Sequence, residues 1–117
     1  MRWDGNVIRV HYRGYIDGPA MRSGADGVKR CLLERRPNAV VFDTVDVEGY
    51  SADVRGPGVE MFRALKEHGI DRAIAISTSS AVRMMGSAWA FTSGLPLEFV
   101  GSREEGERRL ATIAPRR

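Results

Sequence analysis

Residues 38–58, NAVVFDTVDVEGYSADVRGPG, decide how the chain is expected to fold. They open on a continuous apolar run, 39–42, which is typical of an interior strand that is covered on both faces. A second run of this kind lies in DRAIAIST, residues 71–78. Amphipathic segments separate the two runs, and such alternation predicts a mainly parallel sheet. We therefore expect 39–42 and 73–76 to lie side by side and to run in the same direction.

The remainder of this stretch is expected to be a loop over residues 44–58, because it is rich in turn formers and ends in GPG. A helix over residues 59–69, VEMFRALKEHG, follows, with apolar residues at helical spacing and Gly69 as its C-cap. The loop holds one serine, Ser51. From the residues alone, Ser51 is a regulatory switch, a cap on the coming helix, or merely part of the loop.

Before this stretch, NVIRVHYRGYI at residues 6–16 alternates between apolar and polar residues, which predicts a half-buried strand. The turn formers Asp-Gly-Asn ahead of it allow residues 1–3 to pair with it as an edge strand. A helix is expected within residues 18–37, GPAMRSGADGVKRCLLERRP, until Pro37 stops it. Its apolar positions recur at helical spacing: Ala20, Met21, Ala25, Val28, Leu32 and Leu33.

After the second apolar run, hydroxyl side chains offer N-caps for a helix over residues 81–94. A short strand, LEFV at 97–100, comes next. Ser102 followed three residues later by Glu105 is a capping box, which predicts a final helix. The fold class is therefore α/β: a single domain over residues 1–117, with a four- to five-stranded, mixed but mostly parallel sheet and about four helices. We expect its core at about 6–112 and a basic tail at 113–117.

Bulk properties narrow the function classes. The chain has no apolar run of about 18 residues and no secretory signal pattern, so neither a membrane span nor export is expected. The lone cysteine, Cys31, cannot form an internal disulfide, and a cytoplasmic location follows. The net charge of +3 is spread among interspersed acidic residues, which disfavours nucleic acid. The strand face bearing Arg9, His11 and Arg13 is nevertheless a candidate phosphate contact.

Catalysis and metal binding have little support in the sequence. The two histidines and the cysteine, His11, His68 and Cys31, have no ligand spacing, so we expect no metal and no cofactor. Two carboxylate pairs occur, Asp43 with Asp46 and Glu104 with Glu105. No set of nucleophile, base and orienting group can be assembled around either pair, so the chain is not expected to be an enzyme.

Four stretches carry a resemblance to a known family: NVIRVHYRGYIDGPAMRSG (6–24), AVVFDTVDVEGYSADVRGPG (39–58), HGIDRAIAISTSSAVRMMGSAWAF (68–91) and LEFVGSREEGERRL (97–110). Their residue patterns and their order resemble those of the SpoIIAA-like group of STAS-type domains, also described as STAS/SEC14-like. The third stretch is the most telling, because a strand of the form R-x-A-x-x leads through a loop into a hydrophobic helix.

The resemblance implies a small α/β domain used for protein–protein signalling or scaffolding. Anti-sigma-factor antagonists of this kind are switched by phosphorylation of a serine at the start of the helix that follows the second interior strand. The family motif, Asp-Ser-Ser/Thr-Gly-Leu/Met, falls on residues 49–53 here. Ser51 matches it, whereas Tyr50 and Ala52 replace the aspartate and the second hydroxyl. Ser51 is thereby a candidate phosphorylation site.

Two loops are candidate anion sites. A phosphate on Ser51 would lie near a helix N-terminus, where free N–H groups favour an anion, and Arg55 could pair with it. The second loop, at the start of helix 81–94, combines hydroxyls with a guanidinium: Thr78, Ser79, Ser80 and Arg83. Simple capping explains these hydroxyls equally well. Both loops are expected to leave the carboxyl ends of neighbouring parallel strands, and therefore to lie close together.

The helix over residues 81–94 is apolar on more than one face. The residues concerned are Val82, Met84, Met85, Trp89 and Phe91. They are core, or they form a partner groove, an apolar ligand pocket or a homodimer seam. Our main hypothesis is a non-catalytic protein-interaction domain with a protein partner, and an edge strand is a second candidate homodimer contact. The alternative is a SEC14-like module for a small apolar or lipid-like ligand, with a cavity under Val82, Met85 and Trp89.

Overall fold

The computed structural model describes residues 1–112, so the expected basic tail at 113–117 lies outside the described residues. Within them the strands form one five-stranded sheet in the order β1-β2-β3-β4-β5. The strands are β1 (Arg2–Asp4), β2 (Val7–Ile16), β3 (Ala39–Tyr50), β4 (Ala73–Ile76) and β5 (Leu97–Val100). β1 is antiparallel to β2, and the other neighbours are parallel. The expected parallel pairing of the two apolar runs is confirmed, with Val40 opposite Ala73.

The helices begin where capping side chains satisfy their first N–H groups. α1 (Gly18–Glu34) follows Asp17, whose carboxylate accepts a hydrogen bond from the N–H of Ala20. α3 (Ser80–Ser93) and α4 (Arg103–Ala111) are capped by Ser79 and Ser102, respectively. The serine half of the predicted capping box is confirmed, since the Glu105 N–H donates to Ser102 Oγ over 3.1 Å. The Glu105 carboxylate accepts instead from the N–H of Gly101, the residue before the cap. The remaining helices are the short 3₁₀ turn η1 (Ala52–Val54) and α2 (Arg55–Glu67).

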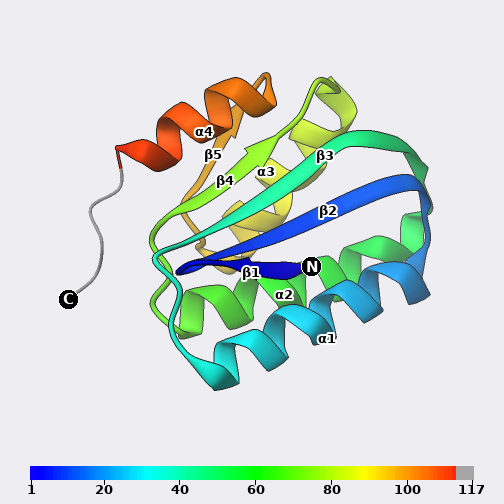
Figure 1. Ribbon diagram of the computed structural model, residues 1–117. Coiled ribbons are helices and arrows are strands. Elements are labelled where there is room, and N and C mark those ends of the chain that lie inside the picture. The colour runs from blue at the N-terminus through cyan, green and yellow to red at the C-terminus, as the bar shows by residue number, and fades with distance from the viewer. Residues whose placement is uncertain (113–117) are drawn as a thin grey trace.

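The sheet separates two hydrophobic cores of unequal size (Figure 1). α1, α2 and α3 pack on one face over the large core, which includes Ile8, Phe42 and Trp89. α4 lies over the other face, where a smaller cluster joins Ile76 and Val100 to the half-buried Leu110. Because α4 does not lie over β1 and most of β2 on this second face, polar side chains such as His11 and Arg13 stay exposed there.

The structure corrects the expected loop over residues 44–58. β3 continues as a strand to Tyr50, because the long β2 offers it a partner as far as Ile16. Residues 45–48, VDVE, alternate β-branched and acidic residues, a pattern that suits a half-buried strand. α2 likewise begins at Arg55, four residues before the expected start, with Pro57 tolerated in its first turn. In α1, Cys31 is buried as expected, but Leu33 is 83% exposed.

Candidate functional site

The inner face of α3 is anchored by one aromatic side chain. Trp89 is 5% exposed and packs edge-on against Phe62 with ring centroids 5.7 Å apart. Phe62 in turn lies 5.4 Å from Phe42 of β3, so an aromatic chain links α3 through α2 to the sheet. Gly58 permits this approach: a Cβ added there would lie 2.5 Å from Trp89 Cη2. The sequence does not reveal this contact, because a glycine in a helix carries no apolar signal.

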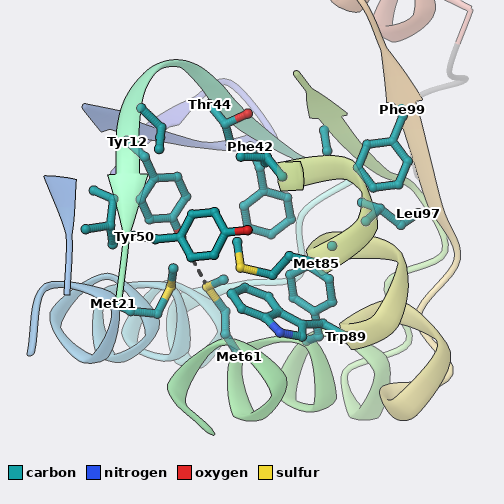
Figure 2. Close-up of a pocket in the computed structure, with 16 residues that line it drawn as sticks. Tyr12, Met21, Phe42, Thr44, Tyr50, Met61, Met85, Trp89, Leu97 and Phe99 are labelled. Atoms are coloured by element: carbon teal, nitrogen blue, oxygen red, sulfur yellow. Dashed lines mark hydrogen bonds between the residues drawn. The ribbon is translucent and has the colours of Figure 1, made fainter. Parts of the chain in front are cut away.

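An apolar cavity of about 60 Å³ lies between α3 and the sheet. Val82, Met85 and Trp89 line it from α3, and Phe42 and Phe99 are among the residues that line it from the strands. Figure 2 shows these side chains converging on one space. Met84 and Phe91, the other two apolar residues named from the sequence, do not belong to the lining.

Tyrosine and threonine also line the cavity, yet their polar groups are largely engaged. The Tyr12 hydroxyl donates to Met61 Sδ over 3.7 Å, and burial raises the pKa of Tyr12. Thr44 Oγ1 donates to the Ile76 carbonyl oxygen over 2.6 Å. Tyr50 is half-buried and points its hydroxyl toward Met85 (Figure 2). Sequence reasoning missed Thr44 and Tyr50 because it assigned both to a loop. The alternation over residues 45–48, between the two, was the available signal for a strand.

The outer face of α3 carries large apolar side chains that pack on nothing. Phe91 is 91% exposed and Met84 is 74% exposed. They lie seven residues apart, which is about two helical turns, with the exposed Ala88 between them. Among the described residues, large apolar side chains this exposed are uncommon, so the outer face of α3 is a candidate contact surface.

The hydroxyl cluster at the start of α3 serves mainly to cap the helix. Ser79 Oγ accepts from the N–H of Val82 over 3.3 Å, and Ser77 Oγ bonds to the backbone of Ser79. Arg83 donates through Nε and Nη2 to the Ser77 carbonyl oxygen, at 3.3 and 3.0 Å, while its guanidinium lies 5.9 Å from the Phe99 ring centroid. Thr78 and Ser80 are exposed. An anion here would therefore compete with a carbonyl for Arg83.

Ser51 lies at the junction of β3, η1 and α1. Its N–H donates to the Ile16 carbonyl oxygen over 3.0 Å, and its hydroxyl donates to the Asp53 carboxylate. The same carboxylate oxygen accepts from the N–H of Gly18 over 2.9 Å. Ser51 therefore helps to hold the carboxylate that binds the first turn of α1, and η1 separates it from the start of α2.

The two candidate anion loops do not leave adjacent strand ends, which corrects the expectation that they do. Asp43 pairs with Ile76, where β4 ends, whereas β3 continues for seven further residues to Tyr50. Seven residues of strand span about 23 Å. The expectation failed because it placed the end of β3 near Asp43.

Comparison with known proteins identifies the fold of this chain through solved structures, but no match to its sequence. No protein-family model matches the sequence, and no curated protein matches it either. The solved structure of the anti-sigma factor antagonist SpoIIAA in its unphosphorylated form superposes with a TM-score of 0.71, at 13% identity over 97% of this chain and 96% of that one. This chain has the STAS/SpoIIAA-like fold.

A second structure supports the same conclusion. It is an uncharacterised protein of the DUF3478 family with a SpoIIAA-like fold from Shewanella loihica PV-4. It superposes with a TM-score of 0.62, at 10% identity over 87% of this chain and 81% of that one. The resemblance seen in the sequence is thus confirmed at the level of the fold, including the mixed, mostly parallel sheet. At these identities the likeness carries no residue roles.

On the other face of this SpoIIAA-like sheet, ion pairs hold α4. Arg103 Nε lies 2.6 Å from Asp43 Oδ2, and Arg103 Nη2 lies 2.8 Å from Asp46 Oδ2. His11 Nε2 lies 2.7 Å from the same Asp46 oxygen. These hydrogen bonds, from His11 first and then Arg103, hold the pKa of Asp46 below its usual value. The pair Asp43 and Asp46, noted in the sequence, therefore holds α4 on the sheet.

The strand face considered for phosphate contacts is paired with carboxylates. Arg9 donates to both Glu107 carboxylate oxygens, at 2.6 and 3.1 Å, and to Asp4 at 2.7 Å. The hydrogen bond to Glu107 is the main reason that the pKa of Arg9 is raised. Arg13 Nη2 lies 3.3 Å from His11 Nδ1. Contacts between residues up to 98 positions apart leave no local trace in a sequence.

Within residues 1–112, no group of three potential ligands is arranged to hold a metal ion. No helix in the described part of the chain is long and apolar enough to cross a bilayer.

Proposed function

We propose that the chain is a non-catalytic protein-interaction domain that binds a protein partner through the outer face of α3. The exposure of Phe91 and Met84 carries the proposal, because neither side chain contributes to the core and both lie on a capped helix. The SpoIIAA-like fold supports it, since a SpoIIAA structure with this fold is that of an anti-sigma factor antagonist. The buried free thiol of Cys31 is compatible with the cytoplasmic location that we include in the proposal.

The experiment is affinity capture from the native host extract, with Phe91→Glu as the test variant. A charge on the outer face of α3 removes the captured partner if that face is the contact. Leu33→Glu is the matched control, because Leu33 is equally apolar and 83% exposed on α1. Loss of capture by both variants, or by neither, contradicts the proposal, as does the absence of any specifically captured protein.

We include Ser51 in the proposal as the regulatory position. A phosphate on Ser51 would bring nearly two negative charges against the Asp53 carboxylate and loosen its hold on the Gly18 N–H. Ser51→Asp is expected to increase hydrogen exchange in the first turn of α1, whereas Ser51→Ala leaves Asp53 its bond to Gly18. Equal exchange in Ser51→Asp and in the unmodified chain would remove Ser51 as a switch.

A second candidate function is binding of a small apolar ligand, and the cavity beneath α3 favours it. Its volume of about 60 Å³ is under half of the roughly 150 Å³ apolar cavity known to admit benzene, so an acyl chain requires side chains such as Met85 to move. Native mass spectrometry of the purified chain tests this. A co-purified small molecule that is lost in Val82→Trp supports ligand binding, and a bare mass contradicts it.

A further inference from the structure

Two observations on the α2–α3 side of the molecule point to the chemistry of the partner. The first is the apolar stripe on the outer face of α3, formed by Met84, Ala88 and Phe91. These residues follow the i, i+4, i+7 spacing of one helical face and cover roughly 10 Å along it. The charged residue of this helix, Arg83, is turned onto the Ser77 carbonyl and away from the stripe. Apart from the exposed Ser87, which shares this helical face, the stripe is apolar.

The second observation is a row of cations on α2 beside the stripe. Arg55, Arg63 and Lys66 are exposed, and their spacing places them along one helical face. None of the three has an ion-pair partner among residues 1–112. Two cations of α1, Arg22 and Lys29, differ because both pair with Glu60.

A shallow groove between α2 and α3 includes two cations of the row, and the residues of the stripe lie outside its lining. It has a volume of about 390 Å³ and is lined by Arg55, Gly56, Val59, Glu60 and Arg63 of α2 and by Thr92 of α3. Thr92 adjoins Phe91 at the end of the stripe. The Glu60 carboxylate in this lining is already engaged by the two cations of α1, so the free charge along the groove is positive.

We propose that the α2–α3 groove binds an acidic amphipathic helix of the partner protein. Apolar side chains of that helix pack on Phe91 and Met84, and carboxylates along its flank pair with Arg55, Arg63 and Lys66. This is helix-in-groove recognition, in which apolar anchors recur at i, i+3, i+4 and i+7 and charge fixes the orientation. The inference rests on the proposed function, because it names the chemistry of the partner at the same surface.

The arrangement favours a helix over a membrane or a second copy of this chain. Membrane-surface helices carry cations on both flanks of the apolar face, whereas the cation on the β5 flank here, Arg83, is engaged by the Ser77 carbonyl oxygen. The other flank of α3 faces β5, where Gly86 approaches Phe99. A symmetric dimer through the stripe would bring two rows of uncompensated cations into one interface.

The test uses labelled synthetic peptides of about 20 residues, long enough to form a helix on binding. The probe carries leucines at i, i+3, i+4 and i+7 and glutamates elsewhere, and its counterpart replaces every glutamate with lysine. We expect fluorescence anisotropy to show about tenfold or more tighter binding of the acidic peptide, with the difference shrinking as salt is raised. Equal binding of the two peptides, or no binding of either, overturns the inference.

Variants locate the binding site of the acidic peptide. Phe91→Glu and the double variant Arg55→Glu/Arg63→Glu should each weaken binding about tenfold or more. Leu33→Glu and Arg108→Glu, which alter exposed residues on α1 and α4, should leave it unchanged. Two further outcomes overturn the inference. One is Phe91-dependent co-sedimentation with phosphatidylserine vesicles, measured without peptide, at a higher affinity than that for the acidic peptide. The other is a Phe91-dependent dimer in sedimentation velocity.

The failure of this inference can be told apart from failure of the proposed function. If host extract yields a partner lost in Phe91→Glu but excess acidic peptide does not displace it, the surface is correct and the partner chemistry is wrong. If no partner is captured, the proposed function itself fails.

Discussion

α3 and α4 each cover part of the sheet, but they are held by opposite means. α3 is anchored by burial, with Trp89 inserted against Gly58 and Phe62, and it has one charged residue. α4 is anchored largely by ion pairs, including Arg103 with Asp43 and Arg109 with Glu98, around a small apolar cluster. Both helices begin at a serine cap, so capping does not distinguish them.

The difference shows which surface is free to bind. The described ion pairs of α4 engage charges with the sheet beneath it, and its exposed side chains are solvated polar groups. α3 needs only its inner face for stability, so Met84 and Phe91 remain available on the outer face. The stability of α3 should therefore respond to changes on one face and not to changes on the other.

The largest effect is expected for Trp89→Ala. Removing a buried indole loses apolar contacts and leaves a cavity that adds to the existing one, at a cost of about 3–5 kcal/mol in the free energy of unfolding. Urea unfolding followed by circular dichroism measures this cost. A loss below about 1 kcal/mol would mean that burial of Trp89 does not anchor α3.

A smaller loss is expected for Gly58→Ala. The added methyl group overlaps the Trp89 ring, so α3 must shift outward, at a cost of about 1–3 kcal/mol. Gly56→Ala in the same helix is the matched control, because a Cβ there meets nothing within 4 Å and alanine favours the helix. If the two variants are equally stable in urea unfolding, the close approach of α2 and α3 is not as described.

Acid should loosen α4 before α3. The Asp46 carboxyl has a folded pKa below its ordinary value of 3.8, so its stabilising contribution is complete above that value and is lost as the pH falls through the folded pKa. The Glu98 pKa is lowered in the same way, chiefly by its hydrogen bond to Arg109. Amide exchange at residues 103–111 should therefore rise between about pH 4 and pH 2, ahead of exchange at residues 80–93. Simultaneous loosening of both helices would contradict the distinction.

The smallest effect on stability is expected for Phe91→Glu. Because Phe91 is 91% exposed, the free energy of unfolding should change by less than about 0.5 kcal/mol, as for Leu33→Glu. Thermal unfolding of both variants checks this. A loss above about 2 kcal/mol from Phe91→Glu alone would show that the outer face of α3 is structural.

The two core strands could be predicted from sequence because residues 39–42 and 73–76 are buried on both faces and carry a purely local apolar signal. The continuation of β3 to Tyr50 could not, because it depends on pairing with β2, more than thirty residues earlier. The sequence likewise showed that the helix carrying Trp89 and Phe91 is apolar on more than one face. Which face points inward is decided by Gly58 of α2, a contact outside that helix.

The candidate site, like the fold, could be predicted only in part from the sequence. For Val82, Met85 and Trp89 the sequence left core, partner groove, ligand pocket and dimer seam open, and the structure places all three in the lining of a cavity. The unpaired state of Arg55 and Arg63 became visible only with the packing, because any sequence with interspersed charges permits ion pairs everywhere. The hydrogen bond from Arg103 to Asp43, sixty residues away, could not be predicted for the same reason.

Hydrogen–deuterium exchange on the chain with and without its captured partner tests the central claim most directly. We predict slower exchange on binding in residues 80–93 of α3 and in the adjoining part of α2, with α4 unchanged. Protection confined to α4 and the ion-paired face of the sheet, with α3 unaffected, would contradict the claim that the outer face of α3 is the binding surface.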